Sequence, residues 1–199
     1  MNLAIDYYLA PQSPWTYLGH ERFVRMAAQA GASVNVLPVD LGGKIFPVSG
    51  GLPLSQRPPQ RQAYRLLELA RWRDFLQLPL NIKPRFFPVA GDDAARLIIA
   101  VEKSDGSAAA LRLTGAVLAA VWAQERDIAN PATRAELLAE CDLSAQCATD
   151  AQSAAVQAAY ERNTQQAIEA GVFGAPSYVA DGELYWGQDR LDFLQRRLG

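Results

Sequence analysis

The segment Ser13–Thr16, with the sequence Ser-Pro-Trp-Thr, follows the short apolar run Leu3–Leu9 after three residues. The run is rich in β-forming residues, and Ser13 followed by Pro14 is typical of a helix N-cap with proline at the first helical position. A strand that turns at once into a helix is therefore predicted. The hydroxyls of Ser13 and Thr16 cannot form a disulfide. A hydroxyl at a helix start can, however, donate a hydrogen bond to a thiolate that comes from another molecule.

The chain after this turn predicts a β-α-β unit and then a loop. The helix should pass through Phe23 and stop before Gly31, and the alternating, β-branched stretch 33–39 predicts a second strand. The stretch 42–59 contains four glycines and four prolines, so we expect a long irregular loop there. Long loops inside compact domains are often functional.

The central part of the chain, 60–170, has a helical pattern without strand-like alternation. The predicted helices cover 62–78, a short segment that starts at Asp92 or Asp93, 107–124, a segment opened by Asn130-Pro131, and 151–170. After Gly171 the pattern changes. It predicts strands at 177–180 and 183–186 joined by Asp181-Gly182, and then an amphipathic helix at 188–198.

This order of elements predicts an α/β fold of the thioredoxin type with a large all-helical insertion. Residues 1–55 and 171–199 would form the thioredoxin-like domain, and residues 56–170 the inserted helical domain. In redox proteins of this fold, a Cys-x-x-Cys motif occupies the place of Ser13–Thr16. The missing cysteines argue against a thiol-disulfide oxidoreductase.

Composition excludes several other classes of function. Half of the 199 residues are hydrophobic and the formal net charge is -2, so we expect no nucleic-acid partner and no polybasic membrane segment. No apolar stretch reaches the roughly 20 residues of a membrane span, and no secretory pattern opens the chain, which predicts a cytoplasmic location.

The two cysteines and the single histidine argue against a zinc motif or a multi-histidine metal site. Cys141 and Cys147 lack the spacing of a redox pair or a zinc motif, and we interpret them as small, partly buried helical residues. The single histidine, His20, is interpreted as a surface or packing residue.

A proline precedes the first strand of the C-terminal hairpin, in the sequence Gly174-Ala175-Pro176-Ser177. In X-Pro bonds the cis form costs only about 0.5–1 kcal/mol. In a thioredoxin-like fold this proline would face the Ser13 turn. We therefore predict a cis bond before Pro176, which leaves the backbone of Ala175 free to pair with an extended peptide.

Three motifs resemble those of one family. They are Ser13–Leu18 near the start, Val172–Ser177 late in the chain and Trp186–Leu191 near its end. With the helical segment between them, they make the chain similar to the 2-hydroxychromene-2-carboxylate isomerases, which are related to the kappa-class glutathione transferases. This resemblance spans nearly the whole chain. It implies a glutathione-dependent isomerase that acts as a homodimer.

The resemblance also implies which residues bind glutathione. Ser13 would hydrogen-bond the glutathione sulfur and favour its thiolate, which the positive end of a helix also stabilises. Ala175 would pair with the cysteinyl part, beside Pro176. The γ-glutamyl end would be held by Trp186, Gly187, Gln188 and Asp189. As alternatives, Ser13 and Asp189 are ordinary helix caps.

The substrate residues follow from the same resemblance. The family's lysine is matched by Lys44, and its Asn-Arg pair by Gln56-Arg57 with one conservative change. The two cations would bind an aromatic carboxylate, arginine in a bidentate manner; the alternative is that both are solvated loop charges. Phe86 stands where the family has a tyrosine, and Ala10 where it has an aspartate, so the native substrate stays open.

In the reaction that the resemblance implies, the glutathione thiolate adds to the unsaturated chromene carbon next to the ring. It leaves again after ring opening and bond rotation, so glutathione is regenerated. Three other functions stay open on the same fold. They are a kappa-like transferase in which the addition is not reversed, a redox protein, and a binding module without catalysis.

Overall fold

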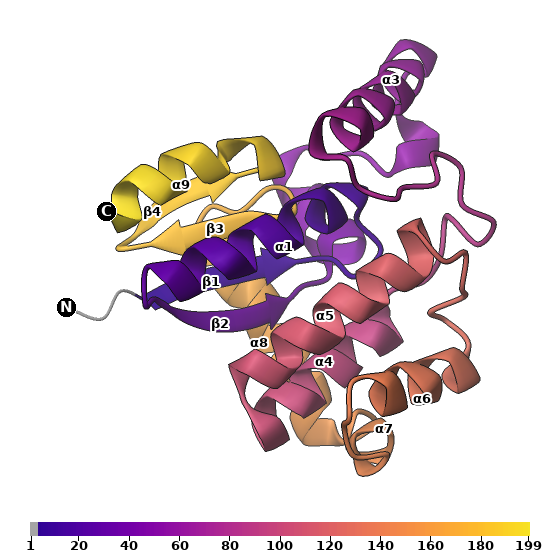
Figure 1. Ribbon diagram of the computed structural model, residues 1–199, viewed down its shortest axis with the longest axis vertical. Coiled ribbons are helices and arrows are strands. Elements are labelled where there is room, and N and C mark those ends of the chain that lie inside the picture. The colour runs from indigo at the N-terminus through magenta and orange to yellow at the C-terminus, as the bar shows by residue number, and fades with distance from the viewer. Residues whose placement is uncertain (1–3) are drawn as a thin grey trace.

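A four-stranded mixed sheet forms the centre of the computed structural model, which describes residues 4–199 (Figure 1). The strands are β1 (Ala4–Leu9), β2 (Ser33–Pro38), β3 (Ser177–Ala180) and β4 (Glu183–Trp186), in the order β2-β1-β3-β4. β1 runs parallel to β2 and antiparallel to β3, and β3 runs antiparallel to β4. The predicted strands are confirmed; the expected first residue, Leu3, lies outside the described residues.

Helices surround this sheet, and most of them were predicted within a few residues of their ends. In chain order they are α1 (Pro14–Gln29), α2 (Phe46–Ser49), α3 (Pro59–Leu76), α4 (Asp92–Asp105), α5 (Ser107–Trp122), α6 (Pro131–Glu140), α7 (Gln146–Asp150), α8 (Ala154–Glu169) and α9 (Leu191–Leu198). Shorter helical turns are η1 (Leu41–Ile45), η2 (Leu54–Gln56) and η3 (Gln188–Arg190). The five-residue α7 was missed because so short a helix shows no periodicity. No helix among residues 4–199 is long and apolar enough to span a bilayer.

The prediction of an irregular loop over 42–59 is wrong in part, because this stretch contains η1, α2 and η2. The carboxylate of Asp40 caps η1 by accepting a hydrogen bond from the Gly43 backbone N–H at 2.7 Å. Gly50, with a φ of 75°, ends α2. Prolines and glycines here begin and end short helical turns instead of excluding them.

Each face of the sheet has its own core, because successive side chains of β1 point to opposite sides. Tyr7 is fully buried against Phe23 of α1 and Tyr178 of β3, with ring centroids 4.6 and 5.3 Å away. Tyr8 belongs to the cluster on the other face, together with Ala167 of α8. In Figure 1, α1 and α9 accordingly lie in front of the sheet and α8 behind it.

The helical segment shares its main core with the sheet. One cluster joins Val36 of β2 to Ile98 of α4 and to Leu113 and Trp122 of α5. α3 differs, because it projects from the rest of the molecule in Figure 1 and buries mainly Leu69, which clusters with Leu18 and Leu80. Its apolar side chains Tyr64, Leu67 and Phe75 are exposed.

His20 is a packing residue of α1, which confirms one of its two predicted interpretations. The ring is 4% exposed, with Nδ1 3.2 Å from the Tyr7 hydroxyl and Nε2 3.0 Å from the carbonyl oxygen of Leu111. Burial lowers the pKa of His20 to about 4, because an imidazolium there would lose its hydration.

Neutral His20 should make the folding stability depend on pH. Its folded-state pKa of about 4 lies below the ordinary value of 6.5, so the unfolded chain takes up the proton first as the pH falls. The stabilisation is complete above pH 6.5 and is lost as the pH falls through about 4. Urea unfolding across this range should show a steeper loss for the wild type than for His20→Gln. Equal slopes would contradict this account.

Candidate functional site

The N-terminus of α1 forms the centre of the candidate site. Ser13 is the N-cap, as predicted, and its hydroxyl oxygen accepts a hydrogen bond from the Thr16 backbone N–H at 3.2 Å. The same hydroxyl donates to the carbonyl oxygen of Ala175 over 3.4 Å. That second bond is long, so a stronger acceptor can replace the carbonyl as partner of the Ser13 proton. The hydroxyl of Thr16 is buried and has no partner within residues 4–199.

Ala175 and Pro176 face this helix start across the sheet. The peptide bond between them is cis, which confirms the prediction. The ladder with β1 begins only at Ser177, opposite Tyr8, so the backbone of Ala175 lies outside the sheet. The carbonyl oxygen of Pro176 accepts a hydrogen bond from the Gly187 backbone N–H at 2.9 Å. This bond links the cis-proline turn to the end of the hairpin.

The residues predicted for the γ-glutamyl end differ in their orientation. Gln188 is 2% exposed, and its carbonyl and side-chain oxygens both accept hydrogen bonds from Arg22. Its side chain therefore faces the protein interior. Asp189 is exposed, and its carboxylate pairs with Arg190 at 2.7 Å. The ammonium group of a ligand would share the Asp189 carboxylate with Arg190 or displace Arg190 from it.

Trp186 stands at the edge of this region. Its ring packs at 4.6 Å on that of Phe173, and both side chains are largely exposed. The absence of a side chain at Gly174 makes this position possible, since a Cβ there would lie 2.2 Å from the indole nitrogen of Trp186. An open groove of about 640 Å³ runs from Trp186 between β4 and α9, past Phe193.

The residues predicted to bind the substrate lie in and after η1 and η2. Lys44 and Gln56 are exposed, and within the described residues neither side chain makes a hydrogen bond or an ion pair. Arg57 is held more firmly. Its Nε donates to the carbonyl oxygen of Leu52 at 2.8 Å, and its guanidinium lies 6.0 Å from the ring centre of Phe46.

Phe86 is half-buried, and the guanidinium of Arg85 lies 5.2 Å from its ring centre. Its neighbour Phe87 packs inward against Trp122 at 4.8 Å and precedes a second cis bond, Phe87–Pro88, which was not predicted. The guanidinium of Arg65, on α3, lies 5.2 Å from the Phe87 ring centre. Arg65 was not predicted as a site residue, because an arginine within an exposed helix is ordinarily a surface residue.

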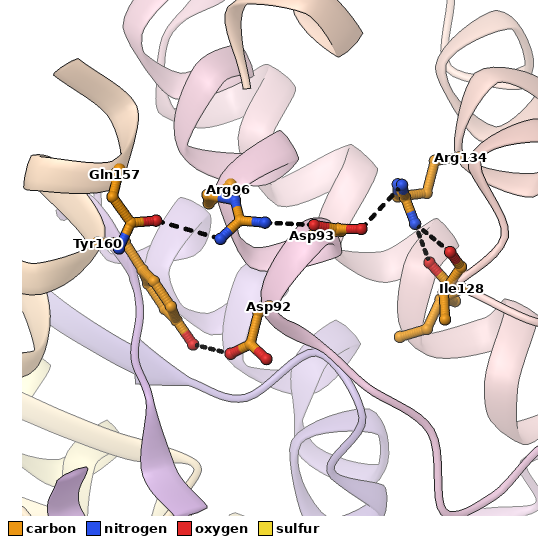
Figure 2. Close-up of polar contacts among 8 residues, drawn as sticks. Asp92, Asp93, Arg96, Ile128, Arg134, Gln157 and Tyr160 are labelled. Carbon is orange, nitrogen blue, oxygen red and sulfur yellow. Dashed lines mark hydrogen bonds and ion pairs between the residues drawn. The ribbon is translucent and has the colours of Figure 1, made fainter. Parts of the chain in front are cut away.

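A polar network fixes the start of α4 near the Ser13 turn (Figure 2). Tyr160 of α8 donates to the carboxylate of Asp92 at 2.9 Å, and Arg134 pairs with Asp93 at 3.1 Å. The residue before this pair, Gly91, packs so tightly on Gln12 that a Cβ would lie 2.1 Å from the side-chain oxygen of Gln12. The network therefore holds the helical segment against the residue that precedes Ser13.

This geometry agrees with the family that the chain matches. Residues 4–199 match the model of the DSBA-like thioredoxin domain. The chain belongs to this family. In this DSBA-like domain, Ser13–Thr16 takes the position at the start of α1 where a redox member would carry cysteines.

Curated relatives of this DSBA-like domain include isomerases. It is 28% identical over 206 residues to a 2-hydroxychromene-2-carboxylate isomerase of Pseudomonas putida, which covers 99% of this chain and 95% of the relative. It is 26% identical over 199 residues to the enzyme of the same name from Sphingobium xenophagum, covering 100% and 99%.

Solved structures give the same fold. A 2-hydroxychromene-2-carboxylate isomerase superposes with a TM-score of 0.80 at 24% identity, covering 98% of this chain and 94% of that one. The cytosolic disulfide reductase DsbM from Pseudomonas aeruginosa, solved with GSH, gives a TM-score of 0.69 at 18% identity, covering 98% and 99%. The thioredoxin-like fold with added helices is thereby confirmed.

Removal of the Ser13 hydroxyl should leave the domain folded. Ser13→Ala removes the N-cap acceptor of α1, and such losses cost about 1 kcal/mol. Ser153→Ala is a matched control, because Ser153 caps α8 through the same contact, with the Val156 backbone N–H at 3.3 Å. Denaturant unfolding should give similar losses for both variants. A loss above about 3 kcal/mol for Ser13→Ala alone would show that Ser13 is needed mainly for packing.

Proposed function

We propose that this protein is a glutathione-dependent isomerase of 2-hydroxychromene-2-carboxylate or a related intermediate of aromatic degradation. The observation that carries the proposal is the match of the whole chain to enzymes of that name. The hydroxyl at the start of α1 supports it, because the relatives' reaction is an isomerisation and this site holds no redox pair.

The residues at the site fit glutathione. Ser13 offers a hydroxyl whose present acceptor is only a long contact, and Ala175 offers backbone outside the sheet ladder. Asp189 offers an exposed carboxylate for an ammonium group. Of Gln188 only the backbone N–H would contact the ligand, because its side chain is bound to Arg22. When bound, glutathione would supply the thiol nucleophile of the reaction.

In the proposed mechanism Ser13 holds negative charge on sulfur. The Ser13 hydroxyl would donate a hydrogen bond to the thiolate and keep its own proton, and the N-terminal end of α1 would add about half a positive charge at the same point. Both interactions favour the thiolate over the thiol, so more nucleophile is present near neutral pH. Lys44 and Arg57 would orient the substrate through its carboxylate.

A disulfide oxidoreductase is disfavoured by the position of the cysteines. Cys141 caps the end of α6 and Cys147 lies in α7, so neither is at the start of α1. Both are free thiols, and burial raises the pKa of Cys141. A kappa-like transferase uses the same glutathione site and differs only in its product.

The homodimer and the cytoplasmic location stay predictions. If two copies associate, the exposed apolar side chains of α3, Tyr64, Leu67 and Phe75, are suited to be covered.

The proposal is tested by following the ultraviolet spectrum of hydroxychromene carboxylate with the protein, with and without glutathione. We expect conversion that requires glutathione and falls by about 100-fold or more in Ser13→Ala, the range reported for losing one preorganised donor to a reacting anion. Ser153→Ala should retain wild-type activity. A stable thioether product would contradict the isomerase and support the transferase, and conversion unaffected by Ser13→Ala would remove Ser13 from the mechanism.

A further inference from the structure

Arg65 is the least expected charged residue in the structure. It is 9% exposed, and its Nη2 is buried without a hydrogen-bond partner among residues 4–199. Its guanidinium lies 5.2 Å from the ring centre of Phe87 and 5.8 Å from that of Trp122. These aromatic faces offset part of the cost of burying a cation, but they accept no N–H···O bond. A buried guanidinium with an unpaired N–H ordinarily has a partner.

Nearby positive charges make a negatively charged partner for Arg65 still more favourable. Burial, followed by the positive charge of nearby Arg57, lowers the pKa of Arg65 to about 10. Arg57 in turn has its pKa lowered by burial and by the positive charge of Arg61. Buried Arg65, half-buried Arg57 and exposed Arg61 take part in no ion pair among residues 4–199, although most other half-buried arginines do. The arginine cluster Arg57–Arg61–Arg65 thus carries uncompensated positive charge.

A second buried N–H group without an acceptor indicates which kind of ligand would bind beside Arg65. The indole N–H of Trp122 is also buried without an acceptor, and Trp122 is fully buried beside Arg65. Both groups donate, and neither can accept. The partner that would satisfy them is therefore an anion or a strong acceptor, not an ammonium group.

The location of this cluster connects it to the candidate site. One turn beyond Arg65, Leu69 packs with Leu18 of α1, in a cluster that also includes Trp15 of the Ser13 turn. On the other side, Phe87 is the neighbour of Phe86, one of the residues predicted to bind the substrate. The arginines therefore lie between the start of α1 and the segment that carries Phe86 and Phe87.

We infer that Arg65, seated on Phe87 and Trp122, is a further residue that binds the carboxylate of the aromatic substrate, beside Arg57, and that it sets the preference for anionic substrates. The inference rests on the proposed function for the identity of the anion. Arg65 is a specificity residue in this account: its fork holds the carboxylate, while Phe87 and the fully buried Trp122 hold the guanidinium in place. Glutathione also carries carboxylates, so the test must separate the two sources.

The test measures binding by calorimetry with an unreactive pair of probes, trans-cinnamate and its neutral amide, without glutathione. The wild type should bind the carboxylate at least tenfold more tightly than the amide, since a charge-assisted hydrogen bond contributes about 1.5–3 kcal/mol. Arg65→Met should abolish that preference, and Arg65→Lys should keep part of it. Arg71→Met is the matched control, because Arg71 lies on the same helix, is exposed and pairs with Glu68 at 2.6 Å.

Two further measurements, glutathione affinity and melting temperature, separate a binding role of Arg65 from a packing role. Glutathione affinity should be the same in Arg65→Met as in the wild type, and a fall in glutathione affinity instead would overturn the inference. The melting temperature of Arg65→Met should be equal to or higher than that of the wild type, because an unpaired buried charge is replaced by an apolar chain. A lower melting temperature with an unchanged cinnamate preference would assign Arg65 to packing. A cinnamate preference without glutathione-dependent isomerisation would reject the proposed function alone.

Discussion

The contact between the start of α1 and the cis-proline turn is the constraint on which the candidate site depends. The long bond from the Ser13 hydroxyl to the Ala175 carbonyl joins two segments that are 162 residues apart in the chain. Its geometry is fixed by the sheet, because β1 leads into α1 and β3 pairs with β1 immediately after Pro176. Everything proposed for glutathione requires that these two backbones stay at this separation.

The large core keeps them there. The rings of Tyr7, Phe23 and Tyr178 pack against one another and so join β1, α1 and β3. His20, beside Tyr7, ties α1 to α5 through the carbonyl of Leu111. The start of α4 packs on Gln12 through Gly91. The helical segment thus helps to hold the site in place. This agrees with the hydrophobic core, which is continuous between the sheet and the helices.

The two proposed anions would be bound by different physical means. The thiolate is held by a hydroxyl and by the backbone N–H groups of a helix start, which carry only partial charge. The carboxylate is held by full charges whose fork matches its two oxygens. This division suits a reaction in which the sulfur must be reactive while the carboxylate serves only for recognition.

Much of this could be predicted from the sequence, for identifiable reasons. Local signals were strong at Ser13-Pro14, at Asn130-Pro131 and at the Asp181-Gly182 turn, and the structure has a helix or a hairpin at each. The cis bond before Pro176 was predictable because the order of the elements already placed this proline before the third strand, facing the Ser13 turn. Side-chain directions were not predictable, because they depend on tertiary packing: Gln188 faces Arg22, and Arg65 is buried although its helix is largely exposed. The short helical turns in 42–59 were missed because the prolines and glycines of this stretch are typical of an irregular loop. In the structure the same residues begin and end short helices.

The central claim is that Ser13 and the start of α1 stabilise a thiolate that a ligand supplies. The direct measurement is the pKa of the glutathione thiol when bound, from the ultraviolet absorbance of the thiolate as a function of pH. The account predicts a bound pKa well below that of free glutathione in the wild type and in Ser153→Ala, and a pKa shifted back toward the free value in Ser13→Ala. A thiol pKa in the wild-type complex equal to that of free glutathione would contradict it.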